Sequence, residues 1–508
     1  MTSRGPTRRL LRGGLLAIAI LALVPASASA HTLTGRYESP LPLAAYLGGA
    51  ALAVALSFAI VILRGGSAAA DATTAAGTAP GRRVRVPRGL RLAVRALGLI
   101  AWVWIVAQAI VGGTNADADV GSLFLWTYGW VALPILSAFL APVWEWLDPF
   151  ATLHDLGAAV ARRLGRTGWR TVPYPPGLER WPAVVAMVLF VWLELVYTSA
   201  RGGQVLGIVV VTYSAWTLLM MARFGRDAWR RNGEVFSVWL GILNRIAPLA
   251  PADEHATSLR TRPFGAGLLE PGWLRGDVVL VAVGTGSILF DGLSQTQAWF
   301  DLVGVPSLGA GTVQLLLFLG LIVGLVLLVA SVVGLRAMAA GLVPIALGYL
   351  IAHYFTALAF DGQRIVTVLS DPLNAGWNLF GGAHFEPDET WLPFGIVWAV
   401  ELIAVVGGHI LGAVMGHRAA ILDADVVTAP AKLPAGRGAA SRKGAARVST
   451  KRTAAAPRTG IWADVRVRQV PLAILMVFLT TLTLWSLGQN LVHAAGEVGA
   501  VLLGTAHA

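Results

Sequence analysis

The segment GYLIAHYFTALAFDGQ, residues Gly348–Gln363, is an apolar run that is interrupted by His353 and ends at Asp361. It lies in a longer apolar stretch, residues 337–360, which has the length that a helix needs to cross a bilayer. An ionisable side chain inside such a span is costly and is usually kept for a function. His353 is therefore a candidate site residue, unless it only hydrogen-bonds to a neighbouring helix.

The composition of the whole chain indicates a membrane protein. Of the 508 residues, 56% are hydrophobic and only 13% are charged, whereas a soluble domain has roughly 25% charged residues. The chain has no cysteine, which excludes disulfides, thiolate metal sites and cysteine nucleophiles. It also has no Walker A motif and no G-x-S-x-G motif, which argues against ATP hydrolysis and against a serine hydrolase of that type.

The first 30 residues have the pattern of a secretory signal peptide. Basic residues precede the apolar core Leu15–Val24, and Ala28-Ser-Ala30 is a suitable cleavage site. The alternative is an uncleaved anchor helix. Cleavage after Ala30 would make His31 the mature N-terminus, where its amine and its imidazole could chelate a metal ion together.

After this segment, ten apolar runs predict ten transmembrane helices, most of them with about 20 residues. The runs cover residues 42–63, 92–112, 122–146, 181–199, 204–222, 278–293, 312–335, 337–360, 393–416 and 470–491, and 278–293 is the shortest. We therefore expect an all-α integral membrane protein. It would consist of a nine-helix domain (31–418), a basic low-complexity linker (419–468), and a last helix followed by the C-terminus (469–508).

The distribution of charge predicts the orientation in the membrane. The formal charge of +12 would suit a nucleic-acid partner, but the basic residues lie in loops between the apolar runs. With the mature N-terminus outside, 32 of the 39 Lys and Arg residues fall in or next to inner loops, as the positive-inside rule requires. We expect a plasma-membrane protein with both mature termini outside, no nucleic-acid partner, and basic loops that contact anionic lipids.

Two inner segments have apolar residues at helical spacing and are predicted to lie on the inner membrane surface as amphipathic helices. The apolar stripes consist of Phe236, Trp239, Leu243 and Ile246 in the segment 233–246, and of Leu156, Val160 and Leu164 in a shorter one.

Four ionisable side chains from four different spans fall in the outer half of the predicted membrane. His353, Glu194 and Glu401 lie inside their spans, and Asp291 lies at the outer end of its span. Buried carboxylates pair, bind a proton or bind a cation, so a shared polar cavity would account for all four. With His31, which enters from the same side, the set could hold a divalent metal such as zinc or copper. The alternative is that each group hydrogen-bonds to a separate neighbour.

A second pair of histidines, His409 and His417, lies eight residues apart on nearly one helix face. Such a pair could ligate haem, but His417 falls at the inner boundary and is expected to be solvated. Glu145 is expected to anchor a span at the inner interface. His154 and His255 lie in inner loops and show no pattern that assigns them a role.

Several segments resemble one family of bacterial, largely actinobacterial, polytopic membrane proteins, some of which are named fenitrothion hydrolase. The resemblance rests on HTLTGRYESPLPL (31–43), FSVWLGILNRIAP (236–248), the His353 segment and VPLAILMV (470–477), and it runs to about Leu491. The family name implies hydrolysis of an organophosphate triester, which usually needs a metal ion to generate hydroxide and to polarise the phosphoryl oxygen. The metal ligands would then be His31, His353, Glu194, Asp291 and Glu401, and a spare carboxylate, Glu401 or Asp291, would be the catalytic base.

Two other functions are compatible with the same residues. In a transporter or permease for a small solute or cation, these groups would bind the cation or relay protons, although the spans show no duplicated halves. In a subunit of an envelope complex, the acidic outer loops would dock a membrane or envelope protein.

Overall fold

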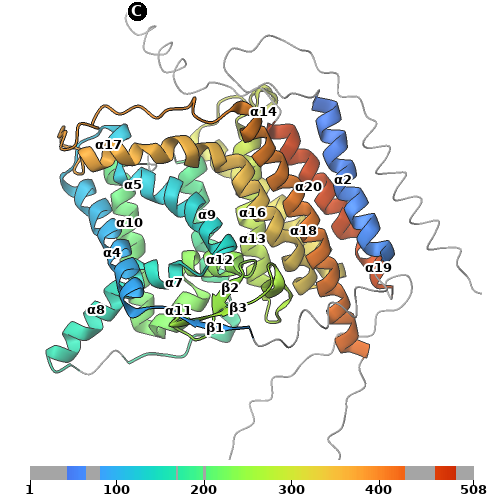
Figure 1. Ribbon diagram of the computed structural model, residues 1–508, viewed down its shortest axis with the longest axis horizontal. Helices are drawn as coiled ribbons and strands as arrows, with labels where there is room; N and C mark the ends of the chain where they lie inside the picture. Colours follow the sequence, from blue (N-terminus) through green and yellow to red (C-terminus); the bar gives the residue numbers. More distant parts are fainter. Residues whose placement is uncertain (1–42, 65–80, 167–169, 198–201, 429–463, 488–508) are drawn as a thin grey trace, which may run out of the picture.

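The computed structural model describes residues 43–64, 81–166, 170–197, 202–428 and 464–487, and these residues form a bundle of helices that run roughly side by side (Figure 1). The predicted signal peptide, His31, most of the predicted linker and the C-terminal segment lie outside the described residues. Their predicted roles therefore stay predictions.

Helices occupy all of the apolar runs that the sequence indicates. They are α2 (Leu43–Arg64), α4 (Arg88–Val111), the continuous α5 (Val120–Ser122), η2 (Leu123–Ala132) and α6 (Leu133–Phe139), then α9 (Trp181–Leu195), α10 (Gly203–Phe224), α13 (Arg275–Ser294), α15 (Leu308–Val333), α16 (Leu335–Phe360), α18 (Phe394–Thr428) and α20 (Val470–Leu487). Within the described residues, seven helices are long and apolar enough to cross a membrane. The chain is thus an all-helical, multi-pass membrane protein in outline, and the count of ten spans stays a prediction.

Shorter elements connect these helices. They are α7 (Trp144–Leu147), α8 (Pro149–Arg163), α11 (Arg226–Asn232), α12 (Val235–Asn244), α14 (Gln297–Val303), α17 (Ile365–Ser370) and α19 (Val465–Arg468), with the 3-10 turns η1 (Ala116–Ala118), η3 (Pro176–Leu178), η5 (Ala266–Leu269) and η6 (Asp361–Arg364). The helix α18 continues twelve residues beyond the predicted end of its span at residue 416, because the charged residues from Arg418 to Asp425 do not interrupt it.

The helix α13, whose span the sequence predicts to be the shortest, is the most enclosed part of the bundle. Of the residues in its span, 94% are buried. It begins three residues earlier than its apolar run because Asp277 caps it, accepting a hydrogen bond from the backbone of Leu274 at 2.9 Å and pairing with Arg180 at 3.0 Å. A search for apolar residues alone misses this charged first turn.

Glycines let α16 and α18 pack backbone against backbone. A Cβ atom at Gly348 would overlap the carbonyl oxygen of Ala404, and one at Gly412 would overlap that of Gly341. Small residues at such positions allow close helix packing inside a membrane, where no hydrophobic effect drives helices together. The two helix backbones are in close contact over about two turns of α16, so α16 and α18 leave little space between them there.

One small sheet departs from the all-helical prediction. The strands β1 (Arg83–Arg85), β3 (Ser258–Thr261) and β2 (Leu249–Pro251) pair antiparallel in the order β1-β3-β2. The sequence analysis missed it because each strand is only three or four residues long and carries no alternating pattern.

The predicted helix in 233–246 is present as α12, but its predicted position on the surface is wrong. Trp239 is 1% exposed and stacks on Trp130 with ring centroids 5.8 Å apart. Gly284 of α13 makes room for this indole, since a Cβ there would lie 2.9 Å from the Trp239 ring. Glu234 caps the helix through the backbone of Phe236 and Ser237. Apolar residues outside the predicted stripe, such as Leu240, are buried as well.

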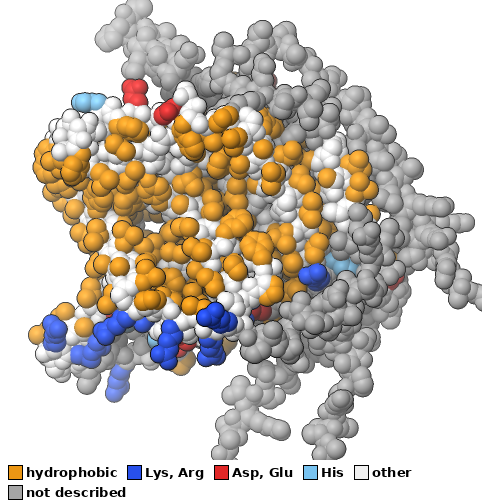
Figure 2. Space-filling model, in the orientation of Figure 1, with side chains coloured by type: hydrophobic (Ala, Val, Ile, Leu, Met, Phe, Trp, Pro, Cys, Tyr) orange, Lys and Arg blue, Asp and Glu red, His pale blue; other side chains and the backbone are white. Residues whose placement is uncertain are grey.

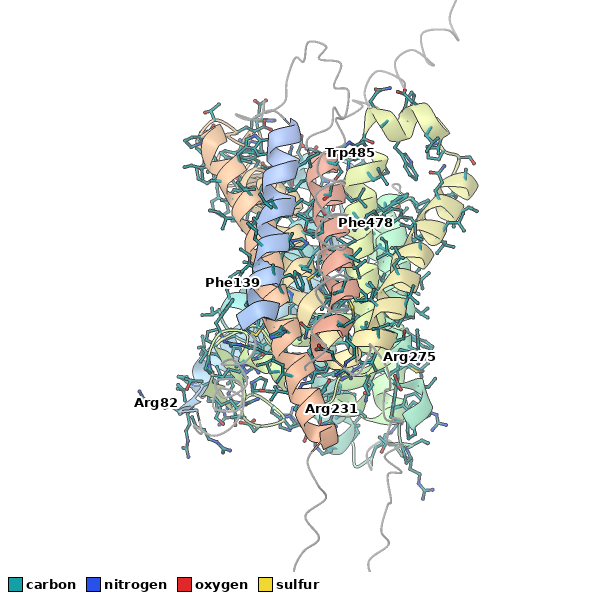
Figure 3. All side chains as sticks on the ribbon, turned by 90° about the vertical axis from the view of Figure 1, so that its right-hand side faces the viewer. Arg82, Phe139, Arg231, Arg275, Phe478 and Trp485 are labelled. Atoms are coloured by element: carbon teal, nitrogen blue, oxygen red, sulfur yellow. The ribbon has the colours of Figure 1, made fainter. Side chains whose placement is uncertain are left out.

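The helix α8 fits the second amphipathic prediction better. Leu156, Val160 and Leu164 are each at least half exposed, and α8 projects from the bundle next to α4 (Figure 1). The face in view in Figure 2 is largely apolar, with basic side chains gathered along one end. Figure 3 shows Arg82 and Arg231 at that end and Trp485 toward the other. This asymmetry is what the predicted orientation requires, and the side that faces the cytoplasm stays a prediction.

Candidate functional site

The side chain of Asp291 lies near the end of α13 that is remote from the arginine-rich end, and three neighbours hydrogen-bond to it. His353 Nε2 is 2.9 Å from Asp291 Oδ2. Tyr354 Oη donates to the same oxygen at 3.0 Å, and Gln295 Nε2 donates to Oδ1 at 2.6 Å. Asp291 is 9% exposed. A buried carboxylate needs such partners, because an unpaired charge is costly away from water.

A second carboxyl group is joined to the first through one hydroxyl. Tyr354 Oη also lies 3.4 Å from Glu194 Oε1 of α9, and Glu194 is 9% exposed. A phenol has one proton to donate and can accept through its oxygen. Both contacts are satisfied together when Tyr354 donates to Asp291 and a protonated Glu194 donates to Tyr354. We name this set, Asp291, His353, Tyr354, Gln295 and Glu194, the Asp291 cluster.

The helix sequences place these side chains. Gln295 follows Asp291 by four residues, so both lie on one face at the end of α13. His353 and Tyr354 are consecutive in α16, with rings almost perpendicular at 84° and centroids 4.6 Å apart. Gly292 sits beside the cluster: a Cβ there would lie 3.1 Å from Ser486 Oγ of α20 and 3.6 Å from His353 Cε1. Because Gly292 has no side chain, Ser486 and His353 can both pack against its Cα.

Further polar side chains continue into the bundle from this point. Ser486 Oγ donates to the carbonyl of Thr483, and both residues are 5% exposed. Deeper in the bundle, Tyr349 Oη of α16 lies 3.3 Å from His409 Nε2 of α18, and both residues are fully buried. His409 Nδ1 lies 2.7 Å from the Val405 carbonyl. Since a carbonyl only accepts, Nδ1 carries the proton and Nε2 accepts from Tyr349.

His417, the second histidine of the His409–His417 pair, is buried and not solvated as predicted. His417 is 2% exposed, and its Nδ1 lies 2.6 Å from Gln469 Oε1. The expectation that it is solvated at the inner boundary is therefore wrong. Gly412 and its contact with Gly341 lie between His409 and His417 along α18, so the two histidines belong to separate polar sites.

Three of the five predicted metal ligands, His353, Asp291 and Glu194, meet in the Asp291 cluster. Glu401 lies half-buried on α18, and His31 is outside the described residues. Among the described residues, no three His, Cys, Asp or Glu side chains are grouped closely enough to hold a metal ion. A zinc site needs three or four protein ligands, so this part of the chain does not supply one by itself, and the metal-binding and catalytic roles stay predictions.

Sequence reasoning missed Tyr354, the residue that joins the two carboxyl groups, although it is adjacent to His353. A tyrosine in an apolar run reads as packing or as an interfacial anchor. The spacing of Thr480, Thr483 and Ser486 along α20 is a signal that could have indicated a polar face on that helix. Gln108, another polar residue in the outer half of a predicted span, has a structural role. Its Nε2 donates to the Ala118 carbonyl at 2.8 Å, and its Oε1 accepts from the backbone N–H of Val120 at 2.7 Å.

No family model, curated protein or solved structure matches this chain. The resemblance to the fenitrothion hydrolase family therefore stays a prediction. Function must be argued from the chemistry of the cluster itself.

Proposed function

We propose that this protein is a membrane transporter that moves protons, with the Asp291 cluster as its proton-binding site. The observation that carries the proposal is the linkage of two buried carboxyl groups from α13 and α9 through the single hydroxyl of Tyr354. Ionisable groups at this depth in membrane helices typically belong to ion pathways and proton relays.

The geometry supports a proton transfer in which atoms and charges balance. Glu194, protonated, gives its proton to the oxygen of Tyr354, and Tyr354 gives its own proton to Asp291 Oδ2. Glu194 becomes a carboxylate, Asp291 becomes a carboxylic acid, and Tyr354 is unchanged. Asp291 can then pass the proton to His353 Nε2, which is 2.9 Å away, when neutral His353 carries its own hydrogen on Nδ1 and leaves Nε2 free to accept. The product of this step is an imidazolium beside a carboxylate.

The polar groups beyond the cluster extend this route toward the centre of the bundle. Gly292 brings His353 next to Ser486, and the buried Tyr349–His409 pair lies deeper. The glycine contact between α16 and α18 then separates His409 from His417 and Gln469. A proton can pass this contact only when the two helices move apart, so the described arrangement corresponds to a closed state of the transporter.

Proton flux into vesicles tests the proposal directly. The full-length protein is placed in vesicles of phosphatidylcholine and phosphatidylglycerol that enclose a pH-sensitive dye, and a potassium gradient with valinomycin sets the membrane potential. We expect the internal pH to change several times faster than in vesicles without protein. Equal rates in the two kinds of vesicle would overturn the proposal.

A further inference from the structure

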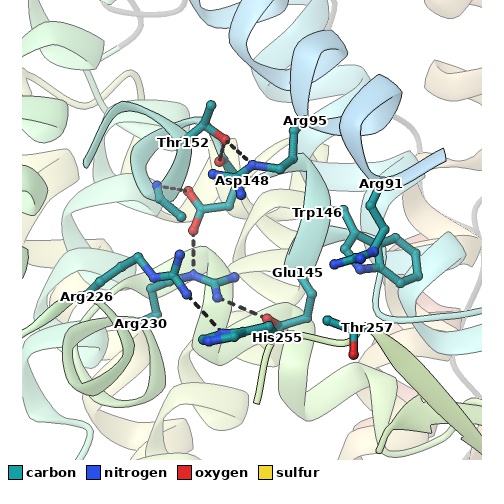
Figure 4. A pocket seen from close by; sticks show the side chains of 11 residues that line it. Arg91, Arg95, Glu145, Trp146, Asp148, Thr152, Arg226, Arg230, His255 and Thr257 are labelled. Atoms are coloured by element: carbon teal, nitrogen blue, oxygen red, sulfur yellow. Dashed lines mark hydrogen bonds and ion pairs between the residues drawn. The ribbon is translucent and has the colours of Figure 1, made fainter. Parts of the chain in front are cut away.

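A second polar site lies at the arginine-rich end of the bundle, which is remote from the Asp291 cluster. A cavity of about 200 Å³ lies between the N-terminal end of α4, the α7–α8 segment, α11 and the loop after β2 (Figure 4). Its volume is below the roughly 300 Å³ at which pockets for drug-sized ligands begin. The cavity thus suits a small group.

Four guanidinium groups line this cavity, from two directions. Arg91 and Arg95 are four residues apart on one face of α4, and Arg226 and Arg230 are four apart on α11. Two carboxylates, Glu145 and Asp148, also line it. Asp155, next to this lining, pairs with Arg95 at 2.7 Å and with Arg226 at 2.8 Å, and Asp227 also pairs with Arg226. Arg91 is therefore the one lining guanidinium without an ion-pair partner among the described residues.

The carboxylates in the wall are already engaged. Arg230 Nε donates to Asp148 Oδ2 at 2.7 Å, and Arg230 Nη1 donates to Glu145 Oε2 at 3.0 Å. The other oxygen of Asp148 accepts from the backbone of Phe150 and Ala151 at the start of α8. Burial lowers the pKa of Arg230, but the charges of Asp148 and Glu145 outweigh it and raise the pKa above its ordinary value. Arg230 is therefore always charged.

Several donors around the cavity remain in excess. Arg230 is 6% exposed, and its buried Nη2 has no hydrogen-bond partner among the described residues. The buried Nε of Arg91 has none either, and Arg91 has no ion-pair partner in the same part of the chain. Arg226 Nη2 lies 3.0 Å from His255 Nδ1. Because a guanidinium only donates, this nitrogen accepts, and neutral His255 carries its proton on Nε2 as one more donor.

From the partnerless buried donors of Arg230 and Arg91, and from the unpaired charge of Arg91, we propose that the cavity binds a phosphate group. Guanidinium groups match the tetrahedral oxyanion in charge and in donor geometry, and buried polar atoms of native proteins rarely lack a partner. The phosphate belongs either to a free anion or to the headgroup of a lipid, since the cavity opens at the end of a membrane-spanning helix. The inference is independent of the proton-transport proposal, because it shares no residue with the Asp291 cluster.

Two binding measurements on the purified full-length protein separate the sources. In the first, inorganic phosphate is titrated by calorimetry in detergent at constant ionic strength, with sodium chloride as the reference. In the second, thermal unfolding is measured in nanodiscs of phosphatidylcholine with and without phosphatidic acid. Binding of phosphate supports the free anion, and stabilisation by phosphatidic acid alone supports the lipid. The absence of both effects would overturn the proposal.

The variant Arg91→Gln tests whether this cavity is the site. A hydrogen bond to a charged group contributes about 1.5–3 kcal/mol, so we expect at least about a tenfold weaker response to phosphate or phosphatidic acid. Arg88→Gln removes the same charge one turn away on α4, outside the lining, and is the matched control, with less than a twofold change expected. Arg91→Lys keeps the charge but loses Nε, and should fall between the two. An undiminished response in Arg91→Gln means an adventitious anion elsewhere and overturns the assignment.

Discussion

The hydroxyl of Tyr354 lies 3.0 Å from Asp291 Oδ2 and 3.4 Å from Glu194 Oε1, so that one oxygen atom joins carboxyl groups from two helices. Because the hydroxyl has a single proton, the two contacts are not equivalent. The shorter contact is the one to Asp291, and in the proposed relay a protonated Glu194 supplies its own proton to the phenol oxygen. This asymmetry gives the relay a direction and can be tested with isosteric substitutions.

The variant Glu194→Gln keeps a donor for Tyr354 but cannot release a proton. We expect its thermal stability to match that of the wild type and its proton flux in vesicles to fall at least several-fold. Tyr354→Phe is the matched comparison: it removes both hydrogen bonds, and should lose about 1 kcal/mol of stability as well as flux. If Glu194→Gln transports protons at the wild-type rate, Glu194 is not part of the relay.

Gly292 is expected to be the least replaceable glycine beside the cluster. An added Cβ in Gly292→Ala would lie 3.1 Å from Ser486 Oγ and 3.6 Å from His353 Cε1. Such overpacking typically costs about 1–3 kcal/mol, so the melting temperature should fall. Gly320→Ala in α15 is the control, because a Cβ there meets nothing within 4 Å and alanine favours a helix by about 1 kcal/mol. Equal melting temperatures for the two variants would contradict the packing described here.

The ion pairs near the arginine-lined cavity predict a loss of stability in acid. Asp155 lies 2.7 Å from Arg95 and 2.8 Å from Arg226. Burial raises the pKa of Asp155, but hydrogen bonds with His154 and Arg95 and the charges of Arg226 and Arg95 lower it well below its ordinary value. The unfolded chain therefore binds the proton first. The stability contributed by this carboxylate is present above about pH 4 and is lost as the pH falls toward the folded pKa.

Thermal unfolding in detergent between pH 6 and pH 3 measures this effect. The melting temperature of the wild type should fall more steeply below pH 4 than that of Asp155→Asn, which has no carboxylate to protonate. Asp301→Asn, at an exposed carboxylate of α14, is the control and should follow the wild type. Parallel curves for the wild type and Asp155→Asn would show that the Asp155 ion pairs do not stabilise the fold.

Bound metal separates proton transport from the hydrolase that the family resemblance implies. A relay through direct contact of Asp291 and His353 needs no metal ion, so we expect metal analysis of the purified protein to give well below one zinc or copper per chain. About one metal per chain, lost in His353→Ala, would instead support a site completed by His31. Mass spectrometry of the N-terminus should accompany this measurement, since that site requires cleavage after Ala30.

The sequence was most informative about features whose energetic cost depends on one short segment alone. The apolar runs locate the helices, and the cost of burying charge identifies Asp291, His353 and Glu194 as related residues before their positions are known. It was less informative where the outcome depends on packing between distant segments. Trp239 lies on a stripe that resembles a surface helix, yet Gly284 and Trp130 bury it. The role of Tyr354 depends on the approach of α9 and α13, which no local pattern encodes.

The arginine-lined cavity shows the same limit more strongly. Arg91, Glu145, Arg230 and His255 come from four segments separated by many residues. In the sequence, Glu145 reads as an interfacial anchor and His255 as a loop residue, because each residue alone has a solvated explanation. Only the fold shows that these residues bring more buried hydrogen-bond donors to the cavity than acceptors.

Proton flux through Asp291→Asn is the most direct test of the proposed function. Asparagine keeps the shape of the side chain and its contact with Gln295 but cannot accept a proton from Tyr354. Asp301→Asn is the matched control, since Asp301 is an exposed carboxylate of α14 that bonds only to Gln297 among the described residues. In dye-loaded vesicles under a fixed potential, we predict that Asp291→Asn lowers the flux at least tenfold toward the protein-free rate, while Asp301→Asn retains it. Wild-type flux in Asp291→Asn, at equal protein content, would contradict the central claim.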